Sequence, residues 1–325
     1  MGAVRNVCVI GLGLIGGSVL RAAADAGRTV WGATTSTSDA ETAAADGFAA
    51  TTDVAAALRE AADSDAVVVL AVPLTALNTV LAEVAKHAPD CLLTDVTSVK
   101  TPVHDSVRAT VPSARFAGGH PMSGTAESGW SAGKSELFDG AAWVVTVESD
   151  TDLVAWREAA TLALDCGAHV VPLRSEAHDE TVARISHLPH LLAAVLASVG
   201  AAGGPVAAAL AAGSFTDGTR VAGTRPELVR AMTEGNAAAL LPVLDEALGA
   251  LGAARGSLAS TGGLAATIDA GHKATRQMAE YRRTSGTNVR VRLSASDARE
   301  SLLAVGERGG RITAFDDDAA LAEMP

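Results

Sequence analysis

Three short polar segments contain the side chains best suited to acid–base chemistry. They are Asp95–Lys100, Gly118–Gly129 and Ser186–His190, and the first two directly follow apolar runs that we expect to be strands. The ordinary pKa of a histidine such as His120 lies near neutrality, so its imidazole can take a proton from a hydroxyl group as a hydride leaves the same carbon. A substrate that carries carboxylates would also need a guanidinium, because the planar fork of donors matches a carboxylate.

A glycine-rich segment near the amino terminus predicts a dinucleotide site. The sequence Gly11-Leu-Gly13-Leu-Ile-Gly16 follows an apolar strand and opens a helix. The first glycine permits a tight turn, the second lets the backbone approach a pyrophosphate, and the third lets helix and strand pack closely. The amino terminus of the helix then faces the phosphates, although a purely structural turn is the alternative reading. The residues that we expect to bind the cofactor are Gly11, Gly13, Leu14, Ile15, Gly16, Thr34, Val72 and Pro73.

The end of the second strand should decide between NAD and NADP. An acid at this position would accept from the ribose 2′-hydroxyl, whereas a cation would bind a 2′-phosphate. The segment Trp31–Thr37 offers neither and supplies only hydroxyl groups such as that of Thr34. We expect NAD because the cation is missing, and NADP stays open. Val72 and Pro73 end the next long strand and should lie beside the nicotinamide.

Composition narrows the class of protein. The 325 residues carry a net charge of −12, which argues against a nucleic-acid partner because no basic stripe offsets it. The three cysteines are widely spaced in apolar stretches, as expected of reduced thiols in a cytoplasm rather than of disulfides or a metal site. No signal peptide is recognisable at the start, and the longest apolar run, Ala66–Leu74, is short of the roughly 20 residues that cross a bilayer. We therefore expect a cytoplasmic protein without a membrane partner.

The first half of the chain alternates strand-like and helix-like segments, which predicts a parallel sheet with helices on both faces. Ligands of such sheets bind at the carboxyl ends of the strands. The expected strands are Val4–Ile10, Thr29–Ala33, Ala66–Val72, Cys91–Val96, Arg115–Ala117, Trp143–Val147 and His169–Pro172.

Helical signals replace strand signals after Pro172. Apolar residues between Leu240 and Leu251 follow the helical period, Thr224–Glu227 reads as a capping box, and Gly213 could end a helix over Pro205–Ala212. The sequence therefore predicts a dinucleotide-binding domain over 1–172, a helical domain over 173–283, and a tail over 284–325.

The tail predicts a small βαβ unit. Asn288–Leu293 alternates like a strand, Ser296–Val305 can be a helix, and Arg311–Phe315 reads as a second strand after a turn at Gly309-Gly310. Residues 282–288 resemble a linker, and we expect disorder only in the last few residues. A unit of about 40 residues is too small to fold alone.

The motifs together resemble the prephenate and arogenate dehydrogenase family. The resemblance covers most of residues 4–283 and rests on the glycine-rich start, the Asp95–Lys100 and His120-Pro segments and the Ser186–His190 segment. It implies a Rossmann-type α/β domain followed by an all-α dimerisation domain, and therefore a homodimer. It also implies oxidative decarboxylation of prephenate to 4-hydroxyphenylpyruvate, in tyrosine biosynthesis, with hydride transfer to NAD.

The resemblance also implies roles for individual residues. His120 would accept the proton of the substrate's C4 hydroxyl, and Ser98 would orient that hydroxyl and the nicotinamide. Arg220 would bind a substrate carboxylate, and His190 would lie near the pyruvyl side chain. The further residues expected to line or brace the substrate site are Thr125, His178, Gly213, Asp217 and Asn236.

Each role has a structural alternative. His120 could be satisfied by backbone in a turn, Ser98 could cap the helix near Thr101, and Arg220 could pair with Asp217. His178 could be structural, and His187 is expected to brace its loop rather than to contact substrate. The chain also departs from many relatives, because Ala126 and not an acid follows the threonine of the His120 segment.

Rival functions share the fold. Arogenate dehydrogenase performs the same chemistry on a substrate with an amino group, and we favour prephenate because a donor at His190 suits a keto group. Another hydroxyacid-type dehydrogenase would bring a lysine at the start of the helical domain, and Pro172–Arg184 contains none. A catalytically silent NAD-binding regulator would not need Ser98, His120 and Arg220.

Overall fold

The computed structural model describes residues 5–125, 127–281 and 286–325, and the chain divides into two compact units. The first unit takes in the described residues up to His178 together with Thr287–Met324, and the second takes in those from Asp179 to Gly286. The tail is thus part of the first unit. The domain borders read from the sequence, at 172 and at 283, remain predictions.

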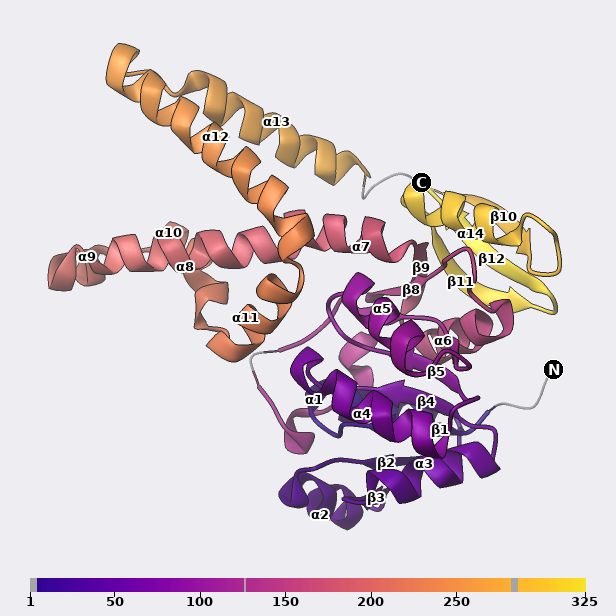
Figure 1. Cartoon of the computed structure of the whole chain (residues 1–325). Coiled ribbons are helices and arrows are strands. Elements are labelled where there is room, and N and C mark those ends of the chain that lie inside the picture. Colours follow the sequence, from indigo (N-terminus) through magenta and orange to yellow (C-terminus); the bar gives the residue numbers. More distant parts are fainter. Residues whose placement is uncertain (1–4, 126, 282–285) are drawn as a thin grey trace. The chain divides into compact units, whose positions relative to one another are not determined.

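The first unit begins with a parallel sheet, as predicted (Figure 1). Its strand order is β3-β2-β1-β4-β5-β6. The strands are β1 (Val7–Ile10), β2 (Val30–Ala33), β3 (Ala49–Thr51), β4 (Val67–Leu70), β5 (Leu92–Asp95) and β6 (Arg115–Phe116). Strand β3 was not predicted from the sequence. Val4, the expected start of the first strand, lies outside the described residues.

Alternate residues of these strands enter different cores, because side chains of a strand point to opposite faces. On one face, Val7 and Val9 join a cluster that includes Val19 of α1. On the other face, Cys8 and Ile10 pack with a cluster formed by three helices. The helices of this part are α1 (Leu14–Asp25), α2 (Thr37–Ala45), α3 (Val54–Asp63), α4 (Leu74–His87) and α5 (Thr101–Thr110).

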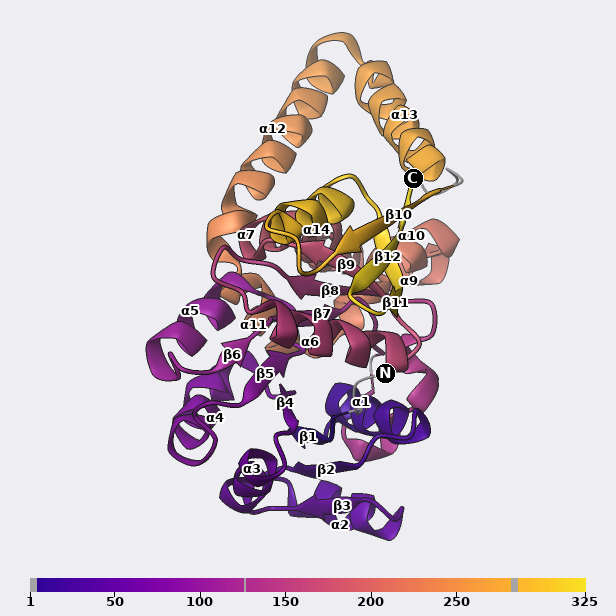
Figure 2. The ribbon, with the colours of Figure 1, turned by 90° about the vertical axis from the view of Figure 1, so that its right-hand side faces the viewer.

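A second, mixed sheet with the order β10-β12-β11-β9-β8-β7 completes the first unit (Figure 2). It contains two strands that alternation had suggested for the parallel sheet, β8 (Ala142–Thr146) and β9 (His169–Leu173), joined by the crossover helix α6 (Leu153–Asp165). It also contains β7 (Gly119–Pro121), a short strand that the sequence did not reveal and that pairs antiparallel with β8. Two 3₁₀ turns, η1 (Trp130–Ala132) and η2 (Ser135–Phe138), follow β7.

The tail contributes the other half of this sheet. The predicted strands and helix are present as β10 (Thr287–Arg292), α14 (Ala298–Glu307) and β11 (Arg311–Asp316). The expectation of disorder at the very end was wrong, because β12 (Ala319–Met324) lies between β10 and β11 and is antiparallel to both. Part of the expected linker, residues 282–285, lies outside the described residues.

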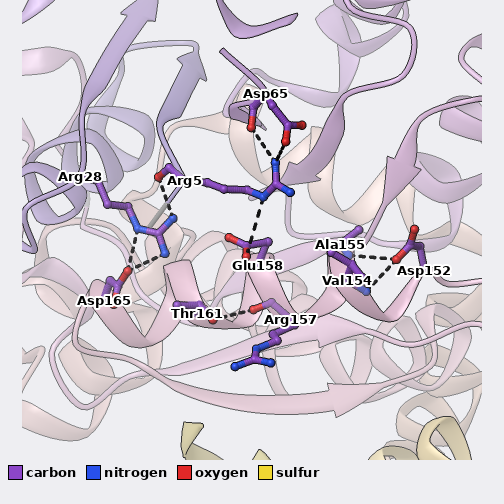
Figure 3. A network of polar contacts seen from close by, with 10 residues as sticks. All are labelled: Arg5, Arg28, Asp65, Asp152, Val154, Ala155, Arg157, Glu158, Thr161 and Asp165. Atoms are coloured by element: carbon purple, nitrogen blue, oxygen red, sulfur yellow. Dashed lines mark hydrogen bonds and ion pairs between the residues drawn. The ribbon is translucent and has the colours of Figure 1, made fainter. Parts of the chain in front are cut away.

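Helix α6 is fixed to the first sheet by ion pairs (Figure 3). The Arg28 side chain is 1% exposed, and its Nη2 lies 2.6 Å from Oδ2 of Asp165 at the end of α6. Arg5, just before β1, reaches Glu158 of α6 at 3.9 Å and also pairs with Asp65. These contacts help to hold α6, which packs against strands of both sheets.

The second unit is all-helical, as predicted. After the end of α7 (Ser175–Val182) it contains a π-helical turn, η3 (Ala183–His187), then α8 (Leu188–Ala201), α9 (Gly204–Leu210), α10 (Gly213–Thr219) and η4 (Arg220–Gly223), followed by α11 (Pro226–Gly235), α12 (Ala237–Thr261) and α13 (Ala265–Tyr281). Two local predictions were wrong. Gly213 begins α10 instead of ending a helix, and α11 starts after Arg225 with no side-chain cap, so Thr224 forms no capping box.

Two helical stretches are long and apolar enough to cross a membrane by length and composition, Ser175–Ala201 and Ala237–Thr261. Neither forms an uninterrupted apolar run, because polar residues interrupt both. Little of either is buried, 22% and 11% of the most apolar window.

Candidate active site

The glycine-rich turn has the close packing that its sequence predicts. Gly11 has a φ of +105°, and a Cβ built on it would lie 2.3 Å from the carbonyl oxygen of Ala71. A Cβ on Gly16 would lie 1.9 Å from the carbonyl oxygen of Gly11. A Cβ on Gly13 would meet nothing within 4 Å, and α1 starts there with no side-chain cap. Strand and helix therefore meet at the first and third glycines, while the second leaves the helix amino terminus open to a phosphate.

Gly17, directly after the motif, packs against a different part of the chain. A Cβ on it would lie 3.1 Å from the ring of Trp130, which is fully buried. The Trp130 indole donates to Asp46 at 2.7 Å, and Arg21 lies 3.6 Å above its ring. The segment that follows the His120 strand is thereby attached to α1 and α2.

The end of β2 presents hydroxyl groups, as predicted. Thr34 is buried, and its Oγ1 accepts from the backbone N–H of Ser36 at 3.3 Å. Ser36 caps α2 by accepting from the N–H of Asp39 at 3.2 Å. The three residues between β2 and α2, Thr34 to Ser36, all carry hydroxyl side chains.

The expected cofactor residues lie at one edge of the parallel sheet. The glycine turn, Thr34, Val72-Pro73 and Ser98 follow β1, β2, β4 and β5, and the carboxyl ends of parallel strands share an edge. Pro73 begins α4. Ser98 is half-buried and does not cap α5, whose first residue is preceded by Lys100 with no side-chain cap.

A buried ion pair joins the first two sequence segments. Asp95 is fully buried at the end of β5, and Lys100, 1% exposed, donates to its Oδ2. Lys100 also donates to the carbonyl oxygen of Gly119, and the other carboxylate oxygen of Asp95 accepts from the Gly119 N–H at 3.0 Å. The pair therefore fixes the strand of His120 against the loop of Ser98.

Asp95, Lys100 and the Gly118-Gly119 pair had no predicted role. A Cβ on Gly119 would lie 2.5 Å from the carbonyl oxygen of Asp95, so only glycine lets the two segments approach this closely. The signal available in the sequence was an aspartate at a strand end with a lysine five residues later, both inside an apolar region.

The predicted catalytic histidine forms an imidazole pair. Nδ1 of His120, in β7, lies 2.8 Å from Nε2 of His178, in α7, and the two ring planes meet at 77°. His178 is 1% exposed, whereas His120 is partly exposed. The alternative that backbone groups alone hold His120 therefore does not describe its surroundings.

In the second unit, His187 braces the chain. It is buried, and its Nδ1 lies 3.1 Å from the Asn236 side-chain amide, which also donates to the carbonyl oxygen of Asp179 at 2.8 Å. His190 is partly exposed, and its Nδ1 lies 2.9 Å from the carbonyl oxygen of Ser186.

The other expected substrate residues are surface groups of their units. Gly213, Asp217 and Arg220 are exposed, and within the described ranges Arg220 makes no ion pair with Asp217 or another acid. Thr125 is exposed and accepts from the N–H of Glu127 at 3.2 Å. Ala126 lies outside the described residues. Their contacts with substrate remain a prediction.

The fold and these residues define a class: a dehydrogenase with a dinucleotide-binding parallel sheet and a separate helical unit. Comparison with known proteins narrows it. The model described as prephenate dehydrogenase, nucleotide-binding domain, matches residues 18–172, and the model described as prephenate dehydrogenase, dimerization domain, matches residues 174–261. The chain belongs to the prephenate dehydrogenase family.

Individual proteins of this family are similar to the chain over most of its length. The cyclohexadienyl dehydrogenase of Zymomonas mobilis is 33% identical over 271 residues, which cover 80% of this chain and 90% of that protein. A solved structure from Corynebacterium glutamicum, provisionally assigned as a prephenate dehydrogenase, is 43% identical with a TM-score of 0.90 and covers 96% of this chain and 99% of its own. The arogenate dehydrogenase of Synechocystis is 27% identical with a TM-score of 0.72, covering 85% and 99%.

Proposed function

We propose that this chain is a prephenate dehydrogenase that oxidatively decarboxylates prephenate to 4-hydroxyphenylpyruvate with NAD, in tyrosine biosynthesis. The observation that carries the proposal is the His120–His178 pair beside the buried Asp95–Lys100 pair, within a chain of the prephenate dehydrogenase family. We infer a soluble, cytoplasmic enzyme that acts on a small molecule and has neither a nucleic-acid nor a membrane partner.

His120 is the proposed proton acceptor. If Nδ1 of His120 carries the hydrogen shared with His178 Nε2, Nε2 of His120 is unprotonated and can accept the proton of the C4 hydroxyl. NAD, when bound, supplies the acceptor for the hydride that leaves C4. The electron pair of the breaking bond to CO₂ then completes the aromatic ring, and the resulting phenolate takes its proton back from His120. The protein's main task is therefore to orient the hydroxyl, with Ser98 as the second contact.

The cofactor proposal rests on charge. A 2′-phosphate would bring about two negative charges to the end of β2, and a phosphate held without a cation is the weaker arrangement. Thr34 to Ser38 supply only hydroxyl and backbone donors ahead of Asp39. We therefore propose a preference for NAD over NADP by a modest factor.

Arogenate dehydrogenase is the second candidate, and one contact favours it. The carbonyl oxygen of Ser186 can only accept, so the Nδ1 of His190 must donate to it. A neutral His190 then offers an acceptor at Nε2, which suits an ammonium group, whereas a keto group needs a protonated His190. This contact weakens the sequence-based argument that His190 favours a keto acid.

A single assay separates these candidates. Purified protein is given prephenate or arogenate with NAD or NADP, in all four combinations, and reduced cofactor is followed by absorbance. We expect the highest kcat/KM with prephenate and NAD. Higher kcat/KM with arogenate would select the second candidate, and turnover of neither substrate would contradict the proposed function.

Arg220 is the proposed carboxylate ligand of the substrate. Losing one charge-assisted bond costs about 1.5–3 kcal/mol, so Arg220→Ala should raise the KM for substrate roughly 10- to 150-fold and change kcat little. The matched control is Arg230→Ala, which removes an exposed arginine of α11 that has no proposed contact with substrate and should leave KM unchanged. An unaltered KM in folded Arg220→Ala would remove this role.

A further inference from the structure

The tail lies beyond both family models and yet belongs to the core of the first unit. The family models end at residue 261, whereas β10, α14, β11 and β12 span 287–324. Leu302 and Val305 of α14 and Ile312 of β11 are buried in the same cluster as Trp156 of α6. Strand β11 also pairs with β9, Ile312 opposite Val170. The tail therefore extends the sheet next to β9 through β11 and packs α14 against β9 (Figure 2).

The contact between α14 and β9 is unusually close. A Cβ on Gly306 would lie 1.7 Å from the carbonyl oxygen of Pro172 and 3.3 Å from Cδ2 of Leu173. The backbone of α14 thus touches the backbone of the last residues of β9. Elsewhere on the same helix, Arg299 donates two hydrogen bonds to the carbonyl oxygen of Thr151, at 3.0 and 2.7 Å.

The residues under Gly306 lead directly to the imidazole pair. Strand β9 ends at Leu173, and α7 begins at Ser175, whose N–H donates to Oε1 of Glu148 at 2.7 Å. His178 lies one turn into α7 and is 2.8 Å from His120. Because Cβ atoms essentially never lie closer than 3.0 Å to another heavy atom, an extra methyl group 1.7 Å from the Pro172 oxygen would force α14 or β9 to shift by more than an ångström. Any part of that shift taken up by Pro172 would pass along this short connection to a hydrogen bond with little tolerance in length.

We propose that the tail is a positioning element of the active site: α14, seated through Gly306 on the carbonyl of Pro172, sets where α7 begins and so where the His178 imidazole meets His120. Gly306 is a positioning residue and touches no substrate. The proposal rests on the proposed role of His120 for its effect on turnover. The geometric effect on the two imidazoles does not depend on that role.

The matched control lies in the tail itself. A Cβ on Gly310 would lie 2.7 Å from Sδ of Met324 and 2.9 Å from the carbonyl oxygen of Val305, within the tail and away from Pro172. Gly306→Ala and Gly310→Ala both strain the tail, but only the first presses on β9. Arg299→Met weakens the seating of α14 without adding an atom beneath it, and it serves if Gly306→Ala does not fold.

The experiment measures turnover, NAD affinity, Tm and histidine side-chain ¹⁵N resonances in the full-length protein. The eight histidines give few signals, and His120→Asn and His178→Gln assign the pair. We expect Gly306→Ala to lower kcat roughly 10- to 100-fold, as misplacement of a catalytic group does, to shift the resonances of His120 and His178, and to leave NAD affinity unchanged. Arg299→Met should shift the same resonances less, and Gly310→Ala should lower Tm alone.

Three results would overturn the proposal. The first is a Gly306→Ala protein whose kcat and imidazole resonances equal those of the wild type. The second is an equal loss of kcat in Gly306→Ala and Gly310→Ala when both lose the same Tm. The third, if Gly306→Ala does not fold, is an Arg299→Met protein with unchanged imidazole resonances. If the wild type oxidises neither prephenate nor arogenate, the proposed function fails. Shifted imidazole resonances in Gly306→Ala would then still support the positioning role.

Discussion

At the scale of single residues, the chemistry depends on how one imidazole is held by another. A lone histidine on a short edge strand could adopt several rotamers and either tautomer. The buried His178 ring, 2.8 Å from His120, restricts both, because its Nε2 faces the Nδ1 of His120. The geometry resembles other sites in which a second group orients the base.

The substitution His120→Asn tests the base directly. It should lower kcat by roughly 10²–10⁴-fold, the usual contribution of a general base, and leave the affinity for NAD unchanged, because the glycine turn expected to bind NAD lies elsewhere, between β1 and α1. Steady-state rates and cofactor titration by intrinsic fluorescence measure the two quantities. His272→Asn, on the exposed α13, is the control. Near-normal turnover in His120→Asn would assign proton transfer to another group.

The buried Asp95–Lys100 pair allows a stability prediction. Removing one partner of a buried pair leaves the other charge uncompensated and typically costs about 3–5 kcal/mol. Lys100→Met should therefore lower the free energy of unfolding by about that amount, measured by urea unfolding. Lys86→Met, which removes an exposed lysine from α4, should cost little. A Lys100→Met protein as stable as the wild type would show that the pair is not needed to hold β5 against β7.

How far the sequence predicts this site depends on the range of the contacts. The glycine turn and the position of Thr34 follow from local spacing, and the structure shows the close packing at Gly11 and Gly16 that the spacing predicts. The pairing of His120 with His178 joins residues 58 positions apart, and Lys100 reaches Gly119 across 19. No local pattern encodes such contacts.

At the scale of elements, long apolar runs were easier to predict than short strands. Strands β1, β4 and β5 are fully buried and read as mainly apolar runs, Val-Cys-Val-Ile, Val-Val-Val-Leu and Leu-Leu-Thr-Asp. The overlooked strands are short or poor in β-branched residues: β3 is Ala-Ala-Thr, β7 is Gly-His-Pro, and β12 is rich in alanine. Their partners, and not their own preference, make them strands.

Helix α6 begins with an aspartate cap that permits a pH prediction. Asp152 accepts from the N–H of Val154 at 2.7 Å and from Arg115 Nε at 2.7 Å. Burial alone would raise the pKa of Asp152, but the bonds from Arg115, Val154 and Ala155 outweigh it, so the pKa lies below its ordinary value. Figure 3 shows the Asp152 carboxylate facing the backbone N–H groups of Val154 and Ala155.

The substitution Asp152→Ala should cost about 1 kcal/mol of unfolding free energy at neutral pH, as the loss of an amino-terminal cap does. Because the folded-state pKa is depressed, this stabilisation is present above the ordinary pKa and is lost as the pH falls through the folded-state value. Urea unfolding from pH 7 to about pH 3 should therefore show the wild type approaching the variant in acid. The variant Asp152→Asn keeps a side-chain oxygen that can cap the helix but lacks the charge. The difference in unfolding free energy between Asp152→Asn and Asp152→Ala should therefore not depend on pH. A constant gap between wild type and Asp152→Ala down to the lowest pH would contradict the role of the carboxylate.

At the scale of the whole molecule, the two units differ in how much apolar surface they bury. The first unit has two large clusters, one on each face of its parallel sheet. The cluster of the second unit contains three buried residues, Ala183, Leu240 and Val243. A helical unit with so small a core gains little hydrophobic stabilisation by itself.

The apolar side chains missing from that core lie on its surface. On α12, Leu241, Leu248, Leu251 and Leu258 are between 55% and 59% exposed, and at about 100° per residue they share one side of the helix. On α8, Val195 and Val199 are 60% and 68% exposed. An apolar row of this length marks a surface that another protein covers, and the family model over 174–261 is a dimerization domain. We propose a second copy of this chain as the occupant, rather than a bilayer.

A charge in the row should break the assembly. We expect the wild type to run in light scattering at about 65 kDa, twice the chain mass of 32.6 kDa, and not to float with lipid vesicles. Leu251→Glu would bury an unpaired carboxylate in the proposed interface, which costs several kcal/mol, so the variant should dissociate at micromolar concentration and lose thermal stability. Val154→Glu, at a 50% exposed position of α6 in the first unit, should leave the mass unchanged. A monomeric wild type, or a dimer indifferent to Leu251→Glu, would exclude the α12 row as the interface, and flotation of the wild type would favour the bilayer instead.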